Sequence, residues 1–260
     1  IFFSLLAIIL LSPVFIIMFI LVGCINGFPV IFKQPRPGKN GKIFMMYKFR
    51  SMTNKKDEKG NLLPDSQRIT KFGTFIRKTS LDEIPQFWNV LKGDMSFIGP
   101  RPKLIKDVLF FPEYTKTLDV RPGITGLAQA NERTNNTWES VFVYNDIYVE
   151  KMSLKMDVQI IFKTIGTVLK HTGVNDGTTD VQDYYYPDYL LRVGRITQDE
   201  YDAGIQKAKR IEKDFVSSRK FRKGFVLKPS YKEQEDFDLQ ERNVDWLKTF
   251  IAYLTHFCIL

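Results

Sequence analysis

Asp82 and Glu83 form a pair of adjacent carboxylates, and such a pair is suited to phosphoryl-transfer chemistry. One carboxylate can attack a phosphoryl group and form an acyl phosphate, while its neighbour can hold a Mg²⁺ ion that neutralises a diphosphate. Ser80 and Glu83 also match a capping box, which predicts a helix over residues 80–91 that ends before Gly93. The pair is thus either an acidic first turn stabilised by the helix dipole or part of a phosphate-binding helix terminus. The two interpretations compete for Glu83, because a carboxylate folded back onto its cap is less available to a metal.

Basic residues surround this pair in the sequence. Between residues 33 and 80, thirteen Lys and Arg residues stand against three Asp and Glu residues, so the excess positive charge of the chain, +9 overall, is concentrated there. Arg77 lies about one helical turn before the pair. Alternation over residues 42–52 predicts a strand with Lys48 and Arg50 on one face. That face suits a phosphate or a lipid headgroup as well as plain solvent.

Two proline-containing turns carry further arginines. Arg101 stands between Pro100 and Pro102. Because the prolines remove backbone freedom, its guanidinium is either aimed in advance at an anion or simply exposed on a rigid turn. Arg121 opens a glycine turn over residues 121–126, which is either an ordinary surface turn or a turn close to a ligand. Local sequence leaves the role of both arginines open.

The first residues of the sequence predict attachment to a membrane. Residues 1–22 are apolar except for two serines and a proline, and about 20 helical residues cover the hydrocarbon core of a bilayer. Inside a helix, Pro13 removes a backbone hydrogen bond, and Ser12 can satisfy the carbonyl that is freed. Two arrangements follow: a kinked spanning helix, or a hairpin that enters and leaves on the same face. Basic residues from Lys33 onward place the following flank in the cytoplasm.

Composition narrows the class of protein further. Hydrophobic residues at 44% and charged residues at 26% are typical of a folded chain, and the net charge favours anionic partners. Cys24 and Cys258 lie in apolar stretches and predict neither a disulfide framework nor a metal cluster, which fits a reducing compartment. The basic block lacks the interleaved exposed aromatics that stack on bases. We therefore expect no nucleic-acid partner.

The second half of the sequence predicts further helices. Periodicity indicates helices over residues 138–148 and 154–169, the latter apolar on one side as in an interfacial helix. Thr197 and Glu200 form a second capping box, followed by apolar residues at helical spacing. Residues 244–260 are apolar and are compatible with packing on the domain or on a membrane.

Taken together, the motifs resemble the bacterial sugar transferases of the monotopic polyprenyl-phosphate phosphoglycosyl transferase family. The resemblance covers about residues 1–175. It rests on an ordered set of motifs: Ser12-Pro13, Gln34-x-Arg36-Pro37-Gly38, Tyr47 to Met52, Arg77 to Gln86, Asn89 to Pro102, and Arg121 to Gly126. This ordered set is far more specific than any one of its members.

The resemblance implies a role for each residue singled out above. Asp82 would attack the sugar-linked phosphate of a UDP-sugar, release UMP and carry the phospho-sugar until polyprenyl (undecaprenyl) phosphate displaces it. Glu83 would bind Mg²⁺. Lys48, Arg77 and Arg101 would meet phosphates, Arg133 would read the nucleotide, and Ser12 with Pro13 would form the apex of a re-entrant hairpin. Arg50 and Arg121 are further candidates for phosphate or substrate binding. Leu127 stands where the family commonly has tryptophan, so the identity of the sugar is not indicated.

The expected architecture is α+β, a mostly helical catalytic domain with a short β-hairpin, an N-terminal re-entrant membrane hairpin and amphipathic interfacial helices. We expect the membrane segment at residues 1–27, the catalytic domain at 28–175 and a C-terminal extension at 176–260. The expected partners are a UDP-sugar, polyprenyl phosphate and membrane lipid at the cytoplasmic face of the bacterial inner membrane, and a homodimer is compatible with this picture. The alternative is a non-enzymatic, membrane-anchored basic module that binds anionic lipid or an acidic partner, which gives no reason for the acidic pair.

Overall fold

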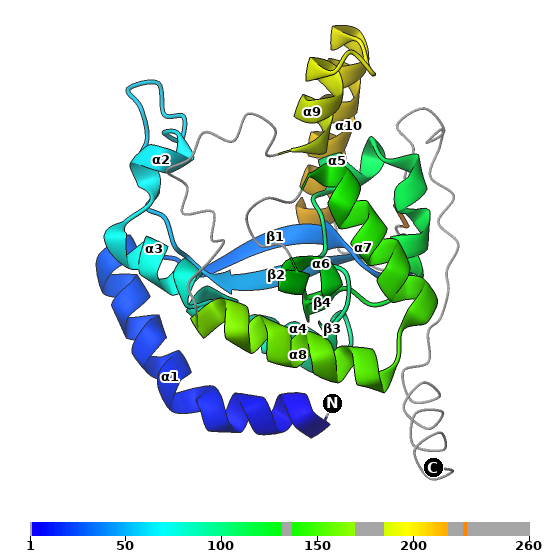
Figure 1. Ribbon diagram of the computed structural model, residues 1–260. Helices are drawn as coiled ribbons and strands as arrows, with labels where there is room; N and C mark the ends of the chain where they lie inside the picture. Colours follow the sequence, from blue (N-terminus) through cyan, green and yellow to red (C-terminus); the bar gives the residue numbers. More distant parts are fainter. Residues whose placement is uncertain (1, 132–136, 170–184, 218–225, 228–260) are drawn as a thin grey trace.

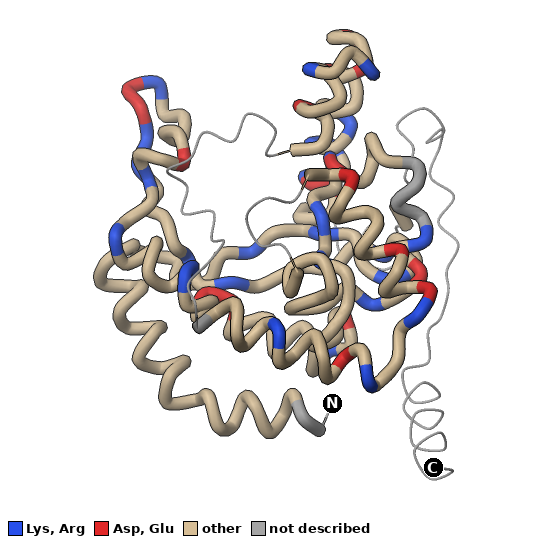
Figure 2. Tube along the Cα trace, in the orientation of Figure 1, with Lys and Arg blue, Asp and Glu red and all other residues tan. Residues whose placement is uncertain are grey.

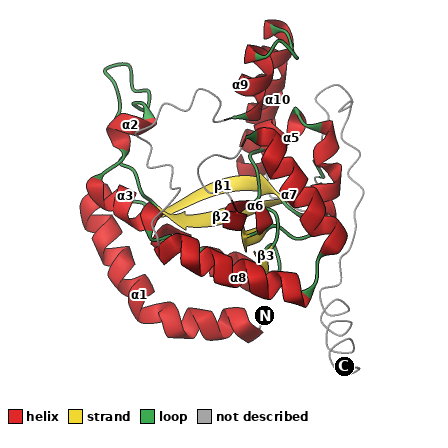
Figure 3. Ribbon diagram, viewed as in Figure 1, coloured by secondary structure: helices red, strands yellow, loops and turns green. Residues whose placement is uncertain are grey.

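The structure is a computed structural model that describes residues 2–131, 137–169, 185–217 and 226–227. Helices make up most of it, with two small sheets near the centre (Figure 3). Strands β1 (Ile31–Pro37) and β2 (Ile43–Phe49) pair antiparallel, from Ile31 opposite Phe49 to Pro37 opposite Ile43. Strands β3 (Ser96–Ile98) and β4 (Gly123–Thr125) form a parallel pair. The predicted α+β class with a short β-hairpin is confirmed.

The helices follow the chain in the order shown in Figure 1. The α-helices are α1 (Phe2–Asn26), α2 (Asp65–Arg68), α3 (Lys71–Lys78), α4 (Gln86–Leu91), α5 (Ile105–Leu109), α6 (Leu127–Asn131), α7 (Trp138–Lys151), α8 (Leu154–Leu169), α9 (Tyr186–Arg192) and α10 (Gln198–Ser217). The 3₁₀-helices are η1 (Lys39–Gly41), η2 (Leu81–Glu83) and η3 (Pro112–Asp119). The helices predicted over 138–148 and 154–169 correspond to α7 and α8. The second capping box is also confirmed, because Thr197 N–H donates to Glu200 at 3.0 Å and Glu200 N–H donates to the Thr197 hydroxyl at 3.2 Å.

Helix α1 is long and apolar enough to cross a membrane, and 11% of its apolar window is buried by the rest of the chain. Figure 2 shows it without a charged residue along its length. The helix is continuous and bends in its middle (Figure 1), and a proline inside a helix is a common cause of such a bend. Pro13 cannot donate to the Ile9 carbonyl, and the Ser12 hydroxyl donates to that carbonyl instead, at 2.7 Å. The expected compensation at this break is confirmed, whereas the re-entrant path stays a prediction.

The end of α1 is built into the folded domain. Met18 and Val22 are buried against Val30, Phe49 and Ile76, so the apolar helix, the hairpin and α3 share one hydrophobic cluster. The Asn26 side chain donates to the Arg50 carbonyl at 2.7 Å and accepts from the Thr70 hydroxyl at 2.8 Å. The end of the anchor is therefore packed onto the domain rather than joined to it by a free linker.

Helix α8 presents an apolar face to the outside. Its Ile160 is buried, but Leu154, Ile161, Phe162 and Ile165 are exposed. Both α8 and the first half of α1 lie toward the lower edge of the view in Figure 1. An exposed apolar helix face of this kind is typical of a surface that meets a membrane. The apolar helix α1 indicates a membrane-anchored protein, and the interfacial role expected for α8 stays a prediction.

Candidate active site

Asp82 and Glu83 lie on a tight turn rather than at the start of a long helix. The predicted helix over 80–91 is split into η2 and α4. The predicted capping box is wrong, because Ser80 has the left-handed backbone φ of 57° and its side chain makes no cap hydrogen bond. An N-cap requires an extended backbone at that residue. Glu83 is instead drawn away to two cations, since charge-assisted hydrogen bonds outweigh a neutral cap.

Glu83 is the centre of an ionic cluster. Its Oε1 accepts from Lys48 Nζ at 2.9 Å and from Arg101 Nη2 at 2.7 Å. Burial opposes ionisation of Glu83, but the charges and hydrogen bonds of Arg101 and Lys48 outweigh it and hold its pKa well below the usual range. Burial and the nearby Arg101 lower the pKa of Lys48. The cluster thus joins β2, η2 and the proline-framed turn.

Asp82 differs from Glu83 in its hydrogen bonding and in the direction of its pKa shift. It is 7% exposed, and none of the described residues donates a hydrogen bond to its carboxylate. Burial raises its pKa to about 6, with Lys48 acting in the opposite direction and Glu83 reinforcing the effect. Arg101 and Arg77 also lie within electrostatic range. Asp82 is therefore ionised at neutral pH and keeps its lone pairs free, as a nucleophile requires.

Two side chains that lie in the sequence motifs, but to which the sequence assigned no role, fix the geometry around this pair. The buried Asn89 of α4 donates to the Met45 carbonyl at 2.8 Å and accepts from Tyr47 N–H at 3.1 Å. Its amide thus makes the two backbone hydrogen bonds that a further strand would make with β2. Lys48 follows directly. An asparagine inside a helix is a weak helix former, and that mismatch is the signal that marks Asn89. The second side chain is that of Arg36. Its Nη1 donates to the carbonyl of Pro102, the residue after Arg101, at 3.1 Å.

Close backbone contacts position Arg77 and Arg101. In α3, a Cβ at Gly73 would lie 1.8 Å from the Ser51 carbonyl oxygen, so only glycine permits this approach. One turn later, Arg77 Nε donates to the Ser51 hydroxyl at 2.8 Å. The turn before Arg101 is pinned to β4, where Gly123 N–H donates to the Pro100 carbonyl at 3.0 Å.

The remaining residues predicted for the site lie elsewhere or outside the described chain. Arg50 Nη1 donates to the Phe28 carbonyl at 3.0 Å, next to the end of α1. Arg121 Nε donates to the Gly93 carbonyl at 3.0 Å, a contact that holds a turn. Arg133 lies outside the described residues. Of the predicted cations, the structure thus brings Lys48 and Arg101 into contact with the acidic pair and Arg77 into its electrostatic range.

A magnesium ion at the acidic pair would need oxygen ligands from a substrate as well as from the protein. No group of three or more His, Cys, Asp or Glu side chains suited to a metal occurs in the part of the chain that the structure describes. Mg²⁺, however, is commonly held by one or two carboxylates together with substrate phosphates and water. Glu83, ionised and next to Asp82, can supply such a carboxylate.

The fold and this site define a membrane-anchored domain with an acidic pair among cations, and comparison with known proteins gives its family. The chain matches the family described as bacterial sugar transferase over residues 1–171, and it belongs to that family. It is 49% identical over 152 residues to the uncharacterized sugar transferase EpsL of Bacillus subtilis, which covers 57% of this chain and 74% of that protein. The predicted family is confirmed.

Two further relatives carry more specific names. The chain is 38% identical over 189 residues to the undecaprenyl-phosphate galactose phosphotransferase of Salmonella typhimurium, covering 65% of this chain and 39% of the relative. It is 39% identical over 173 residues to the UDP-glucose:undecaprenyl-phosphate glucose-1-phosphate transferase of Klebsiella pneumoniae, covering 62% of this chain and 37% of the relative. The chain therefore spans well under half the length of these two proteins.

Proposed function

We propose that this chain transfers a sugar 1-phosphate from a UDP-sugar to undecaprenyl phosphate through a covalent intermediate on Asp82. The observation that carries the proposal is the contrast within the acidic pair. Asp82 is buried, ionisable near neutral pH and free of described hydrogen-bond donors, while Glu83 is held by Lys48 and Arg101. The names of the Salmonella and Klebsiella relatives support the choice of donor and acceptor class.

The first step forms an acyl phosphate. A carboxylate oxygen of Asp82 attacks the sugar-linked phosphorus, the bond from that phosphorus to the bridging oxygen breaks, and UMP leaves with that oxygen. Arg101 and Lys48 bind the neighbouring Glu83 and lie within electrostatic range of Asp82, which supports a role for them in meeting the charge that spreads over the phosphoryl oxygens. Mg²⁺ held by Glu83 would neutralise part of the diphosphate charge when bound.

The second step regenerates the enzyme. An oxygen of undecaprenyl phosphate attacks the same phosphorus, the phosphorus–oxygen bond to Asp82 breaks, and the product is a polyprenyl-diphospho-sugar. The acceptor is a lipid, and α1 packs directly against β2, the strand that carries Lys48. The anchor therefore keeps the acidic pair close to the membrane surface, at the cytoplasmic face where nucleotide sugars are found. The product would start a lipid-linked surface glycan.

The proposal is tested by UMP release from a panel of UDP-sugars with Mg²⁺, with and without undecaprenyl phosphate. We expect Asp82→Asn to lose at least about 10³-fold in rate, because an amide cannot form the acyl phosphate. The matched control is Asp202→Asn, which removes an exposed carboxylate on α10. Full activity in Asp82→Asn would exclude this nucleophile. Vesicle binding without turnover of any UDP-sugar would favour the alternative, a non-enzymatic basic module.

A further inference from the structure

The helices α9 and α10, which lie beyond the region matched by the family, pack on the element that follows Arg101. Helix α10 contacts α5 closely, and a Cβ at Gly204 would meet the ring of Phe110 at 2.1 Å. Ala208, Ile211 and Phe215 of α10 are buried in the same hydrophobic cluster as α5. The close packing of α10 on the Phe110 ring therefore requires a residue without a side chain at position 204.

The buried carboxylate of Asp107 joins α9 to the turn of Arg101. Asp107 is 5% exposed; its Oδ2 accepts from Leu104 N–H at 3.2 Å, and its Oδ1 accepts from Tyr186 N–H at 3.1 Å. Leu104 is three residues after Arg101, and Tyr186 is the first residue of α9. Both oxygens of Asp107 are thus occupied by backbone groups from two segments far apart in the sequence.

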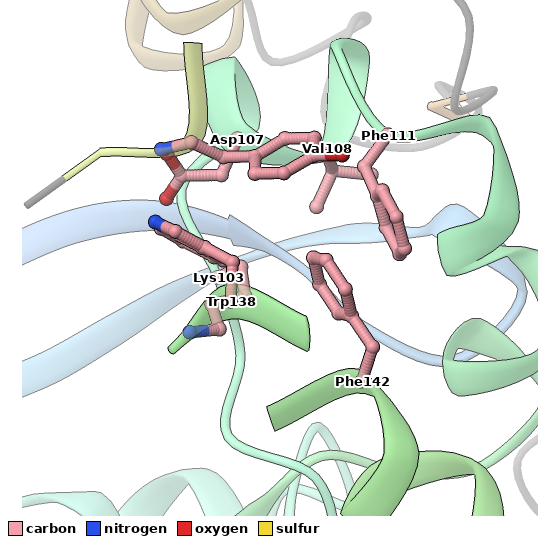
Figure 4. A pocket seen from close by; sticks show the side chains of 7 residues that line it. Lys103, Asp107, Val108, Phe111, Trp138 and Phe142 are labelled. Carbon is pink, nitrogen blue, oxygen red and sulfur yellow. The ribbon is translucent and has the colours of Figure 1, made fainter. Parts of the chain in front are cut away.

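Three aromatic residues, here called the aromatic wall, line the same pocket as Lys103, the residue after Pro102: Phe111, Trp138 and Tyr186. Figure 4 shows Lys103 pointing toward the carboxylate of Asp107, and its Nζ lies 4.1 Å from the centre of the Trp138 ring. The Tyr186 ring packs on Trp138 and Phe111, with centroids 5.2 Å and 5.1 Å apart. Burial lowers the pKa of Lys103 to about 8. A cation in such a cluster gains from the ring faces, and here α9 supplies one of the rings.

Arg36 of β1 completes the contacts on the other side of Arg101. Its Nη1 donates to the Pro102 carbonyl at 3.1 Å, and its Nη2 donates to Gln34 Oε1 at 2.7 Å. Helix α10 also contacts β1, and Glu212 of α10 lies within electrostatic range of Arg36. The turn is thus held at Pro102 by Arg36, at Lys103 by the aromatic wall and at Leu104 by Asp107.

We propose that α9 and α10 form a brace that holds the Arg101 turn in its working position, with Arg36 and Asp107 as positioning residues. This inference rests on the proposed function, in which Arg101 meets the phosphoryl group. Arg101 reaches Glu83 from a side chain that is 42% exposed, and the backbone of its turn sets where that side chain starts. Misplacement of a reacting group by about 1 Å costs on the order of 10²-fold in rate. Supporting contacts around the turn therefore control the position of its guanidinium.

The test is a double-mutant cycle between the brace and Arg101. Gly204→Ala forces α10 and the Phe110 ring apart, and it changes no residue of the acidic pair or of its cations. We expect kcat/KM for UMP release to fall about tenfold in the otherwise native chain, and less than about twofold in an Arg101→Gln background, because the brace acts through Arg101. Gly166→Ala on α8 is the matched control, since a Cβ there meets nothing within 4 Å. An equal fold loss in both backgrounds, or no loss in the native one, would overturn the brace.

A second series does not depend on the packing of α10. Arg36→Gln should lose activity in the same Arg101-dependent way, and Arg36→Lys, which keeps a donor for the Pro102 carbonyl, should recover part of it. Equal losses in Gln and Lys variants, additive with Arg101→Gln, would count against a positioning role. The outcomes separate the two proposals. Full activity of Arg101→Gln and Asp82→Asn would sink the proposed function, whereas an inactive Asp82→Asn and a weakened Arg101→Gln with a fully active Gly204→Ala would sink the brace alone.

Discussion

At the scale of residues, Asp82 and Glu83 are adjacent in sequence but have opposite electrostatic environments. Glu83 shares one oxygen between two cations, and Asp82 is buried beside them without a described donor. Adjacent carboxylates with separated pKa values are suited to different roles. The pKa values of the two carboxyl groups are separated because Glu83, and not Asp82, binds Lys48 and Arg101. Two predictions follow from this difference.

The first prediction concerns pH. Burial raises the pKa of Asp82 to about 6, and the nucleophile is the ionised form. We expect the rate constant of the UMP burst, measured without undecaprenyl phosphate at low UDP-sugar concentration, to be level above pH 7 and to fall about tenfold per pH unit below pH 6. Omitting the acceptor removes its own titration from the profile. A profile that stays flat down to pH 5 would contradict the assignment.

The second prediction concerns stability. The pKa of Asp82 is raised by folding, so its charge weakens the fold increasingly as pH rises from about 4 to about 6 and constantly above that. The pKa of Glu83 is depressed, so its contribution is present above its unfolded value and is lost as pH falls below it. At pH 7, Asp82→Asn should therefore raise the free energy of unfolding, by up to about 2–3 kcal/mol.

Glu83→Gln should lower the free energy of unfolding, in contrast to Asp82→Asn. It leaves Lys48 and Arg101 without their counterion, and we expect a loss of roughly 1–3 kcal/mol, below the value for a fully buried pair because Arg101 is partly exposed. Thermal unfolding of both variants in the same detergent measures the contrast. Shifts of the same sign would show that the two carboxylates do not differ in the way described.

At the scale of elements, Asn89 connects α4 to β2 and thereby sets the distance between the acidic pair and Lys48. We expect Asn89→Leu, which is similar in size, to leave Tyr47 N–H and the Met45 carbonyl without partners and to cost about 2–4 kcal/mol. The rate of UMP release should fall as well, since Lys48 is the next residue along the strand. Unfolding and activity are measured on the same preparation. Unchanged stability in Asn89→Leu would refute the bridging role.

At the scale of the whole molecule, the exposed face of α8 predicts contact with the membrane in addition to the anchor α1. Phe162 is 71% exposed. We expect Phe162→Glu to weaken binding to vesicles that contain anionic lipid by about fivefold or more, because a charge on this face opposes insertion. Gln159→Glu adds the same charge on the flank of α8 and is the control. Equal binding of the two variants in flotation assays would argue against an interfacial role.

The sequence by itself determined the apolar anchor, the compensation of Pro13 by Ser12, strand β2, α7, α8 and the Thr197 cap. Each of these depends on residue spacing along one element, which periodicity and capping rules report directly. It also indicated the acidic pair with Lys48, Arg77 and Arg101, because the ordered motifs identify the family.

Only the tertiary structure decided what these residues contact. It replaced the predicted capping box with a left-handed Ser80 and an ion cluster, because the partners of Glu83 come from positions 35 residues before and 18 residues after it in the chain. It also placed α10 against Phe110, next to α5, through Gly204, and it tied α9 to the Arg101 turn through Asp107. Competition between a local cap and distant cations is settled by charge and burial in the folded state. No local pattern contains that information.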